Sequence, residues 1–141
     1  MFKNHDPGRI VGSWKGIPFL GFMDGTFLSA ARAEAAFSES VGAQGDVTRV
    51  RSRNRTGTVT LTLKAASPTN DLLTAQAILD ELTGLGYGPL LIKDLNGTTV
   101  VEAAIAWIEK VPDTEFATEE SGREWVFKCA ELYIAAGGNI L

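Results

Sequence analysis

The chain has 141 residues, a net charge of −4 at pH 7 and an isoelectric point near 5.0, with 45% hydrophobic and 21% charged residues. This composition predicts one globular domain over residues 1–141 and excludes a disordered body. The acidic balance argues against general nucleic-acid binding, which is typical of basic domains. Residues 1–8 lack the apolar core of a secretory signal, and no apolar run is long enough to span a membrane. We therefore expect a protein made in a cytoplasm, with a loose N-terminal arm over residues 1–8.

Short strands and turns are expected first along the chain. Residues 9–22 are apolar but interrupted by Gly16 and Pro18, which predicts two short strands around a tight turn. Asp24 and Gly25 indicate another turn. Residues 29–37 are ambiguous, because their alanines favour a helix by intrinsic propensity.

Residues 47–64 carry the most distinctive pattern, a long alternation with the period of two that marks a β-strand. The odd positions hold four arginines and then apolar residues: Arg49, Arg51, Arg53, Arg55, Val59, Leu61 and Leu63. The even positions from Ser52 onward are polar and include Thr58, Thr60 and Thr62. We expect one long strand whose basic end is not buried, because an unpaired buried cation is too costly. That end must reach solvent, a polyanion or acidic groups of another subunit.

A helix is predicted over residues 70–83. Residues 67–71 have the side chains of a helix start, with an acid in the first turn. Apolar residues then recur at helical spacing, at Leu72, Ala75, Ile78, Leu79 and Leu82. Gly84 and Gly86 are expected to end the helix.

The last third of the chain predicts strands again. Residues 90–95 form a short strand, and Asn96 with Gly97 is a strong hairpin signal. Residues 98–111 fit one face of a helix or of a strand, and the hairpin favours the strand, with Val101, Ala103, Ile105, Trp107 and Val111 on one face. Residues 114–122 indicate an acidic loop, and residues 124–135 a final strand. The expected fold is mainly β: an antiparallel sandwich or barrel with one packed helix.

The residue types of common catalytic and cofactor sites do not occur together. His5, the only histidine, lies in the N-terminal arm, and Cys129, the only cysteine, is expected to be a buried thiol. No P-loop or dinucleotide motif connects a strand to a helix. Glu115, Glu119 and Glu120 indicate a solvated loop more than a cation or acid/base site. We expect no enzymatic activity, no metal and no cofactor.

Several segments resemble the tail tube proteins of long-tailed bacteriophages of the contractile kind. These segments are residues 21–27 (GFMDGTF), 41–49 (VGAQGDVTR), 57–63 (GTVTLTL), 67–71 (SPTND), 91–97 (LIKDLNG) and 106–110 (AWIEK). The resemblance implies two antiparallel sheets with one helix, as in the tube proteins of type VI secretion systems. It also implies hexameric rings, stacked into a hollow tube that joins capsid to baseplate and passes DNA without specific binding. The implied location is the virion, with sheath, baseplate and tail terminator proteins as partners.

Two groups of residues receive hypothetical roles in such a tube. The basic residues Arg49, Arg51, Arg53 and Arg55 are expected to pair with acidic groups of a neighbouring ring, at Glu115, Glu119 or Glu120. The alternative for them is a solvated hairpin tip without a partner. The polar strand face, with Thr58, Thr60 and Thr62, is a candidate lining of the aqueous channel. An acidic protein suits such a channel, because bound cations would slow the DNA.

Other protein classes remain open on the sequence. A tube protein of a secretion system or of a phage-derived particle would share the fold and the assembly. A tail terminator or sheath-associated protein is another possible virion part. A small-ligand-binding β-barrel belongs to a different class, and it predicts a monomer with an apolar cavity lined by Trp14, Trp107 or Trp125.

Overall fold

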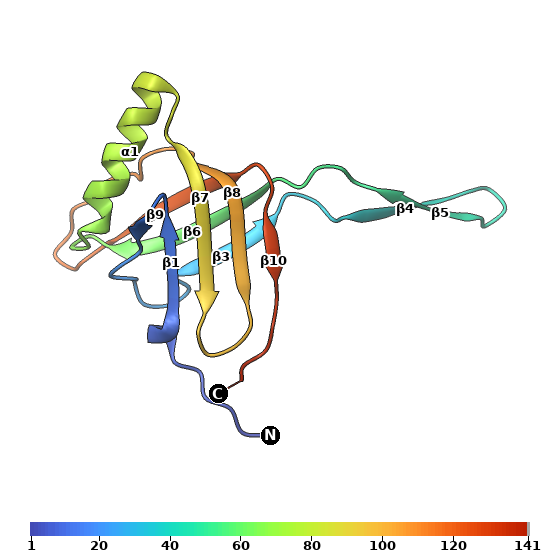
Figure 1. Ribbon diagram of the computed structural model, residues 1–141, viewed down its shortest axis with the longest axis horizontal. Helices are drawn as coiled ribbons and strands as arrows, with labels where there is room; N and C mark the ends of the chain where they lie inside the picture. Colours follow the sequence, from blue (N-terminus) through green and yellow to red (C-terminus); the bar gives the residue numbers. More distant parts are fainter. Residues whose placement is uncertain (141) are drawn as a thin grey trace.

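The computed structural model describes residues 1–140 and shows a mainly β architecture with antiparallel strand pairs and one α-helix (Figure 1). Residue 141, the end of the expected domain, lies outside the described residues. The elements in chain order are η1 (Pro7–Arg9), β1 (Ile10–Trp14), β2 (Ile17–Pro18), β3 (Leu28–Arg32), β4 (Phe37–Val41), β5 (Val47–Arg51), β6 (Gly57–Lys64), α1 (Thr69–Thr83), β7 (Tyr87–Asp94), β8 (Val100–Ile108), β9 (Gly122–Cys129) and β10 (Tyr133–Ala135). The expected fold class is confirmed.

One sheet forms the body, with the strand order β2-β1-β7-β8-β9-β6-β3. On one edge, strand β8 pairs with two different strands: its first residues pair with β10 and its last residues pair with β9. The sheet therefore bends at β8, and Figure 1 shows β9, β6 and β3 crossing behind β1, β7 and β8. The core fills the space between these two halves, and α1 closes one side of it.

Strand β6 has the predicted alternation. Val59, Leu61 and Leu63 are fully buried, while the threonines between them are half-buried on the opposite face. Strand β9 pairs with β6 along its whole length and buries Trp125 and Phe127 beside these residues. The alternation of apolar and polar residues in this part of the chain therefore correctly predicts a strand with one face in the core.

Aromatic side chains form the centre of the core. The rings of Trp14 and Phe127 pack edge to face, with centroids 5.2 Å apart, and Phe19 lies 5.8 Å from Phe127. Each buried indole also has a hydrogen-bond acceptor. Trp14 donates to the backbone oxygen of Ala106 at 3.0 Å, and Trp125 donates to Oδ1 of Asn70 at 2.9 Å. These bonds satisfy the polar atoms that burial would otherwise leave unpaired.

Residues 47–64 do not form one strand, so that prediction is wrong. β5 pairs only with β4, in a separate two-stranded sheet, whereas β6 belongs to the body. Residues 52–56 between them make local bonds instead: the side chain of Ser52 accepts from the Asn54 N–H at 3.2 Å, and that of Asn54 accepts from the Thr56 N–H at 3.1 Å. Such side-chain bonds compete with a strand ladder, which explains the break in a pattern that is continuous in the sequence.

Two further segments differ from expectation in detail. Residues 28–32 pair with β6 as β3, so tertiary pairing overrides the helix propensity of the alanines. The expected final strand is divided into β9 and β10 by a turn, where the Leu132 N–H donates to the Arg55 carbonyl at 2.9 Å. The hairpin at Asn96 and Gly97 joins β7 to β8, as predicted.

Strand β8 confirms the preference for a strand over a helix at residues 98–111, but the predicted face is wrong after Ala103. The register shifts between Gly88 and Leu90 of β7, so that two residues, Ala104 and Ile105, face Pro89. A bulge of this kind reverses the alternation of the side chains that follow. Ile105 and Trp107 consequently lie on the outside of the sheet. In a strand without the bulge, both side chains would face the core.

The N-terminal residues contact the hairpin between β7 and β8. The Asp6 N–H donates to Oδ1 of Asn96 at 3.2 Å, and Nδ2 of Asn96 donates to the Asp6 carbonyl at 2.9 Å. Nδ2 of Asn139 donates to the Asn4 carbonyl at 2.9 Å. Within the segment expected to be loose, Asn4 and Asp6 are therefore attached to the body.

Candidate assembly surfaces

A hairpin that we call the arm, residues 33–56, extends from the body (Figure 1). β4 and β5 pair in it over five residues each, and its tip is a turn in which Gly45 has a φ of 87°. Every strand residue of the arm is exposed, including Phe37, Val41, Val47 and Val50. A two-stranded ribbon alone is only marginally stable in water. An exposed ribbon of this kind is typical of a segment that is stabilised by docking on another surface.

The arginines of the arm occupy two different environments. In β5, the guanidinium carbons of Arg49 and Arg51 lie 4.0 and 5.5 Å from the centroid of the Phe37 ring. Stacking on an aromatic face holds a guanidinium in place while its N–H donors stay free. Arg53 and Arg55 lie instead in the segment between β5 and β6. The predicted single basic strand face is thus split in two.

No arginine of the arm forms a salt bridge within the described residues, and Glu39 faces Arg49 across the β4–β5 pair. Among residues 1–140, the one salt bridge joins Lys110 to Asp113. The arm has three acidic residues of its own, Glu34, Glu39 and Asp46, of which Glu34 accepts a hydrogen bond from the Ser52 hydroxyl. The arginine charges remain available to an acidic partner.

Residues 109–121, which we call the acidic loop, join β8 to β9. The predicted partners Glu115, Glu119 and Glu120 all lie in this loop and are exposed. The loop is tied to the body near its end, where the Ala65 N–H donates to the Ser121 carbonyl at 3.1 Å. Five acidic residues and one lysine make the acidic loop strongly negative.

The arm and the acidic loop lie at opposite ends of the molecule. In the antiparallel pair of β6 and β9, Gly57 faces Cys129 at the end where the arm joins β6, and Lys64 faces Gly122 at the end where the acidic loop joins β9. Eight residues of strand separate these ends by about 25 Å. Figure 1 shows the arm on one side of the body and the chain leading into β9 on the other. The structure therefore does not bring the arginines and glutamates together within one chain.

The candidate channel residues share one polar face of the sheet. Thr58, Thr60 and Thr62 point away from the core, with Ser29 of β3 beside Thr60. On the other side, Lys128 of β9 donates to the Thr58 hydroxyl at 3.4 Å, and Glu124 faces Thr62. The face thus combines hydroxyls with one charge of each sign, and it includes Val126 beside Thr60.

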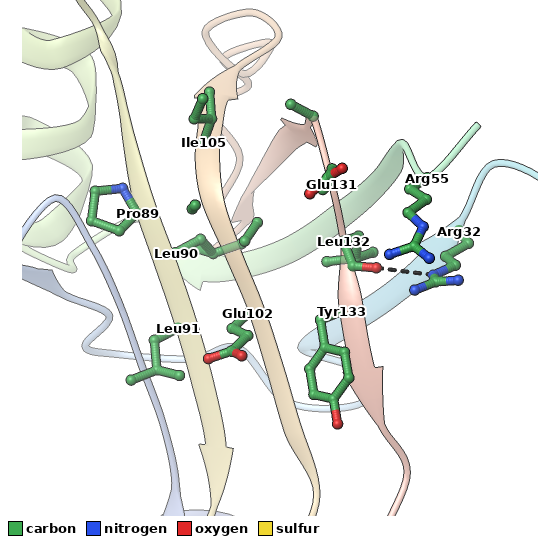
Figure 2. A pocket seen from close by; sticks show the side chains of 13 residues that line it. Arg32, Arg55, Pro89, Leu90, Leu91, Glu102, Ile105, Glu131, Leu132 and Tyr133 are labelled. Carbon is green, nitrogen blue, oxygen red and sulfur yellow. Dashed lines mark hydrogen bonds between the residues drawn. The ribbon is translucent and has the colours of Figure 1, made fainter. Parts of the chain in front are cut away.

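A groove of about 750 Å³ lies where the arm joins the body (Figure 2). Its lining is mostly apolar and comes from β7, β8 and the chain around β10: Pro89, Leu90, Leu91, Ala103, Ala104, Ile105, Ala130, Leu132 and Tyr133. Arg32 and Arg55 lie together at one end of it, and Nε of Arg32 donates to the Leu132 carbonyl at 2.9 Å. Glu102 and Glu131 also line the groove. The β8 bulge supplies Ile105, which a regular strand would have turned into the core.

The helix α1 confirms its prediction, and Gly84 ends it in the left-handed conformation with a φ of 72°. Its core face, however, is formed by Thr69, Leu73 and Ala77. The apolar residues whose spacing predicts the helix are instead all exposed. We call these residues the outer stripe: Leu72, Ala75, Ile78, Leu79 and Leu82. The helix therefore carries apolar residues on two opposite faces.

Within residues 1–140, no group of three or more His, Cys, Asp or Glu residues is placed to hold a metal ion. The three tryptophans do not share a cavity either, because Trp14 and Trp125 are buried in the core and Trp107 faces outward. Trp107 lines a hollow on the outside of the sheet, together with Asp80, Tyr87 and Ile105. No helix of the described chain is long and apolar enough to cross a membrane.

Cys129 provides a prediction about pH. Burial raises the pKa of its thiol from 9.0 to about 11. Between these values the unfolded chain releases a proton that the folded chain retains, so the free energy of unfolding should fall as the pH rises through this window, with no contribution from this thiol below it. Urea unfolding at several pH values, with Cys129→Ala as the comparison, isolates this contribution from other titrating groups. Equal pH slopes for the two proteins across the window would contradict the prediction.

Comparison with known proteins identifies the family. The model of a family described as the bacteriophage PhiTE tail tube protein matches residues 24–137, which include the arm, the acidic loop, α1 and every strand except β1 and β2. This chain belongs to that tail tube family. It is accordingly a structural protein of the phage tail, a part of the virion, and not an enzyme.

A curated relative supports the assignment. Structural protein ORF10 of Pseudomonas phage KPP10 is 31% identical over 121 residues, which are 84% of this chain and 70% of the relative. The resemblance to tail tube proteins that the sequence motifs show is thereby confirmed.

Solved structures agree on the fold of the tail tube protein. The cap of the anti-feeding prophage, a tube-terminating protein, matches with a TM-score of 0.66 at 11% identity, over 96% of this chain and 93% of the other. A sheath/tube terminator of the extracellular contractile injection system PVC matches with 0.64 at 13%, over 96% and 99%. A chain of the PVC sheath-tube complex matches with 0.62 at 13%, over 93% and 90%. At these identities, the similarity shows the fold alone.

Some residues of these surfaces are missed by sequence reasoning. The stacking of Phe37 on two arginines depends on the register of β4 against β5, in which Phe37 faces Arg51. The turn residues between positions 41 and 47 are a signal from which that hairpin could have been found. The groove had no such signal, because the bulge that builds it is visible only in the strand pairing.

Proposed function

We propose that copies of this tail tube protein, each a single domain over residues 1–141, close into hexameric rings that stack into a hollow tube. In the proposed tube, DNA passes through the channel during ejection. The observation that carries the proposal is the position of the basic arm and the acidic loop at opposite ends of the molecule. Complementary surfaces at opposite ends favour head-to-tail contacts between copies, which repeat without limit along an axis.

In this tube, the arm of one ring reaches the acidic loop of the next. Arg49, Arg51 and Arg53 are the arginines closest to the tip, and the partners proposed for them are Glu115, Glu119 and Glu120. An exposed ion pair contributes only about 0.2–1 kcal/mol. A ring repeats each pair in every subunit, so that weak pairs together stabilise the stacking.

The channel is proposed to be lined by the polar face of β3, β6 and β9. Thr58, Thr60 and Thr62 present hydroxyls there, and Lys128 and Glu124 balance each other in charge. A near-neutral hydroxyl surface offers few cations to the DNA phosphates, so that DNA can slide without being held.

The proposed partners are a sheath, a baseplate and a tail terminator, as in a contractile tail. The solved structures of similar fold include sheath-tube and terminator assemblies of contractile injection systems, which supports this proposal by analogy of fold. Those systems also represent the alternative, a tube of a phage-derived particle. The match to a phage tail tube family favours the phage tail.

The proposal is tested by negative-stain electron microscopy of the purified protein over a concentration series, with and without a baseplate nucleus. We expect hollow rings or tubes of uniform diameter, whose rotational averages show the number of subunits per ring. If only monomers form at high concentration, and a nucleus does not change this, the proposal is wrong.

A further inference from the structure

The arm is attached to the body by two short segments, residues 33–36 and 52–56, which we call the arm root. The ladder between β3 and β6 ends at Arg32 and Gly57, before the arm root begins. Two backbone hydrogen bonds, of 3.0 and 2.8 Å, connect the two segments to each other. Such bonds hold the two chains of the arm together but do not fix the direction in which the arm leaves the body. That direction must depend on contacts between the arm root and the body.

One residue of the body, Leu132, bonds to the chain on both sides of the arm. It lies in the turn between β9 and β10. Its N–H donates to the Arg55 carbonyl at 2.9 Å, on the side that leads into β6. Its carbonyl accepts from Nε of Arg32 at 2.9 Å, on the side where the chain leaves β3 (Figure 2). Both chains that enter the arm are therefore tied to the same residue.

Leu132 is a fixed point of the body. It is 1% exposed, and its side chain belongs to the core. It packs where β6 has no side chain: a Cβ at Gly57 would lie 2.8 Å from Leu132 Cβ and 2.9 Å from the Ala31 carbonyl oxygen. The turn is also bound to β8, because the Ala130 N–H donates to the Ile105 carbonyl at 3.0 Å and β10 pairs with β8.

The Arg32 side chain is used for this contact rather than for an ion pair. Within residues 1–140, its hydrogen bond is the one to Leu132, and its guanidinium forms no salt bridge. Glu102 and Glu131 also line the groove beside it, but neither is ion-paired with it. Nε is the guanidinium donor nearest to the backbone, and the planar group fixes the direction of its N–H. A bond from Nε therefore restrains the end of β3 more tightly than a contact of the terminal nitrogens would.

We propose that Arg32 is a positioning residue for the stacking of rings, because its bond to Leu132 sets the direction of the arm. The inference rests on the proposed tube and adds the contact that aims the arm at the next ring. Residues 33–44 extend over about 40 Å at the rise of a β-strand. A rotation of about 15° at the arm root would move the tip by about 10 Å, well beyond the distance of about 4 Å at which opposite charges pair. An arm that is already aimed also loses less conformational freedom on docking.

The test measures the direction of the arm in dilute monomer, by electron paramagnetic resonance of two nitroxide labels. The labels are attached to Ala43→Cys, in the turn at the tip of the arm, and to Lys93→Cys on β7, which are both exposed positions. Cys129→Ala removes the remaining thiol. Arg32→Met keeps a similar side-chain length but has no donor. We expect a narrow distribution of label distances for the unaltered arm root and a distribution broader by about 10 Å for Arg32→Met.

Two further variants separate the hydrogen bond from the charge. Arg32→Gln places an amide nitrogen at the same number of bonds from Cα as Nε, without the positive charge, and should keep the narrow distribution. Arg55→Met removes the neighbouring charge and leaves the backbone bond to Leu132 in place, so it should keep the narrow distribution as well. A narrow distribution for Arg32→Met would overturn the inference. A broad one for Arg32→Gln would also overturn it, because the charge of Arg32 would then act instead of its hydrogen bond.

Tube growth provides the second readout. Arg32→Met should raise the protein concentration needed for tubes by about tenfold or more, whereas Arg32→Gln should form tubes at about the concentration of the unaltered chain. Circular dichroism shows whether both variants are folded. Normal tube growth from Arg32→Met, despite a broadened distribution, would overturn the inference and leave the proposed tube intact. If the unaltered chain forms no tubes with a nucleus present, the proposed tube itself is wrong, and the stacking role of Arg32 is wrong with it.

Discussion

Reversing the charge of Arg51 and Arg53 to glutamate should abolish tube growth and leave the isolated chain folded. Both residues lie on the arm, outside the core, and neither is ion-paired within residues 1–140. The change therefore costs little folding free energy. In the proposed stack it places negative charge against the acidic loop, and every subunit of a ring repeats the repulsion. Electron microscopy counts the tubes, and circular dichroism reports folding.

Two comparisons make this experiment specific for the arm. Lys3→Glu/Lys93→Glu changes the net charge by the same amount at residues outside the arm and should still form tubes. Glu119→Arg/Glu120→Arg, combined with the arm reversal in one chain, should restore stacking, because the signs of both surfaces are then exchanged. Normal tubes from the arm variant alone would show that the arginines are a solvated tip without a partner.

Replacing Phe127 by alanine should produce a large loss of stability. Phe127 is fully buried and contacts the rings of Trp14 and Phe19 at the centre of the core. Truncation of a buried phenylalanine costs about 3–5 kcal/mol, from lost transfer free energy and from the cavity left behind. The free energy of unfolding of a typical domain is only about 5–15 kcal/mol. Urea unfolding of the purified chain measures the effect.

Phe116→Ala is the matched control for this prediction. Phe116 lies in the acidic loop and is 89% exposed, and its one aromatic contact is a distant stacking with Arg123 at 5.9 Å. Its removal should change the free energy of unfolding by less than about 0.5 kcal/mol. Equal losses for the two variants would contradict the position of Phe127 at the centre of the core.

Arg49 and Arg51, which stack on Phe37, show why part of the candidate assembly surface cannot be predicted from the sequence. The chain alternates from residue 47 to residue 64, and nothing in that pattern marks the break after Arg51. The break depends on local bonds of Ser52 and Asn54 and on the pairing of β5 with β4. The sequence therefore predicts an exposed group of four arginines. It does not predict that Arg49 and Arg51 stack on Phe37 while the other two lie in the segment between β5 and β6.

The outer stripe shows the same limit for the helix. Helical spacing at Leu72, Ile78 and Leu79 correctly predicts α1, because periodicity reports a helix face whatever that face contacts. It does not show which face meets the core. Leu73 and Ala77 face the core because of the way α1 is placed against one side of the bent sheet.

The sequence by itself determined the mainly β class, the helix, the hairpin at Asn96 and the buried face of β6, since each depends on periodicity or turn chemistry within a short window. It also determined the tail tube family, through motifs spread along the chain. Only the tertiary structure decided that the arm leaves the body, that a bulge turns Ile105 outward and that the acidic loop lies at the opposite end. The bulge and the opposite position of the acidic loop depend on the pairing of separate strands, which no pattern within one short window shows.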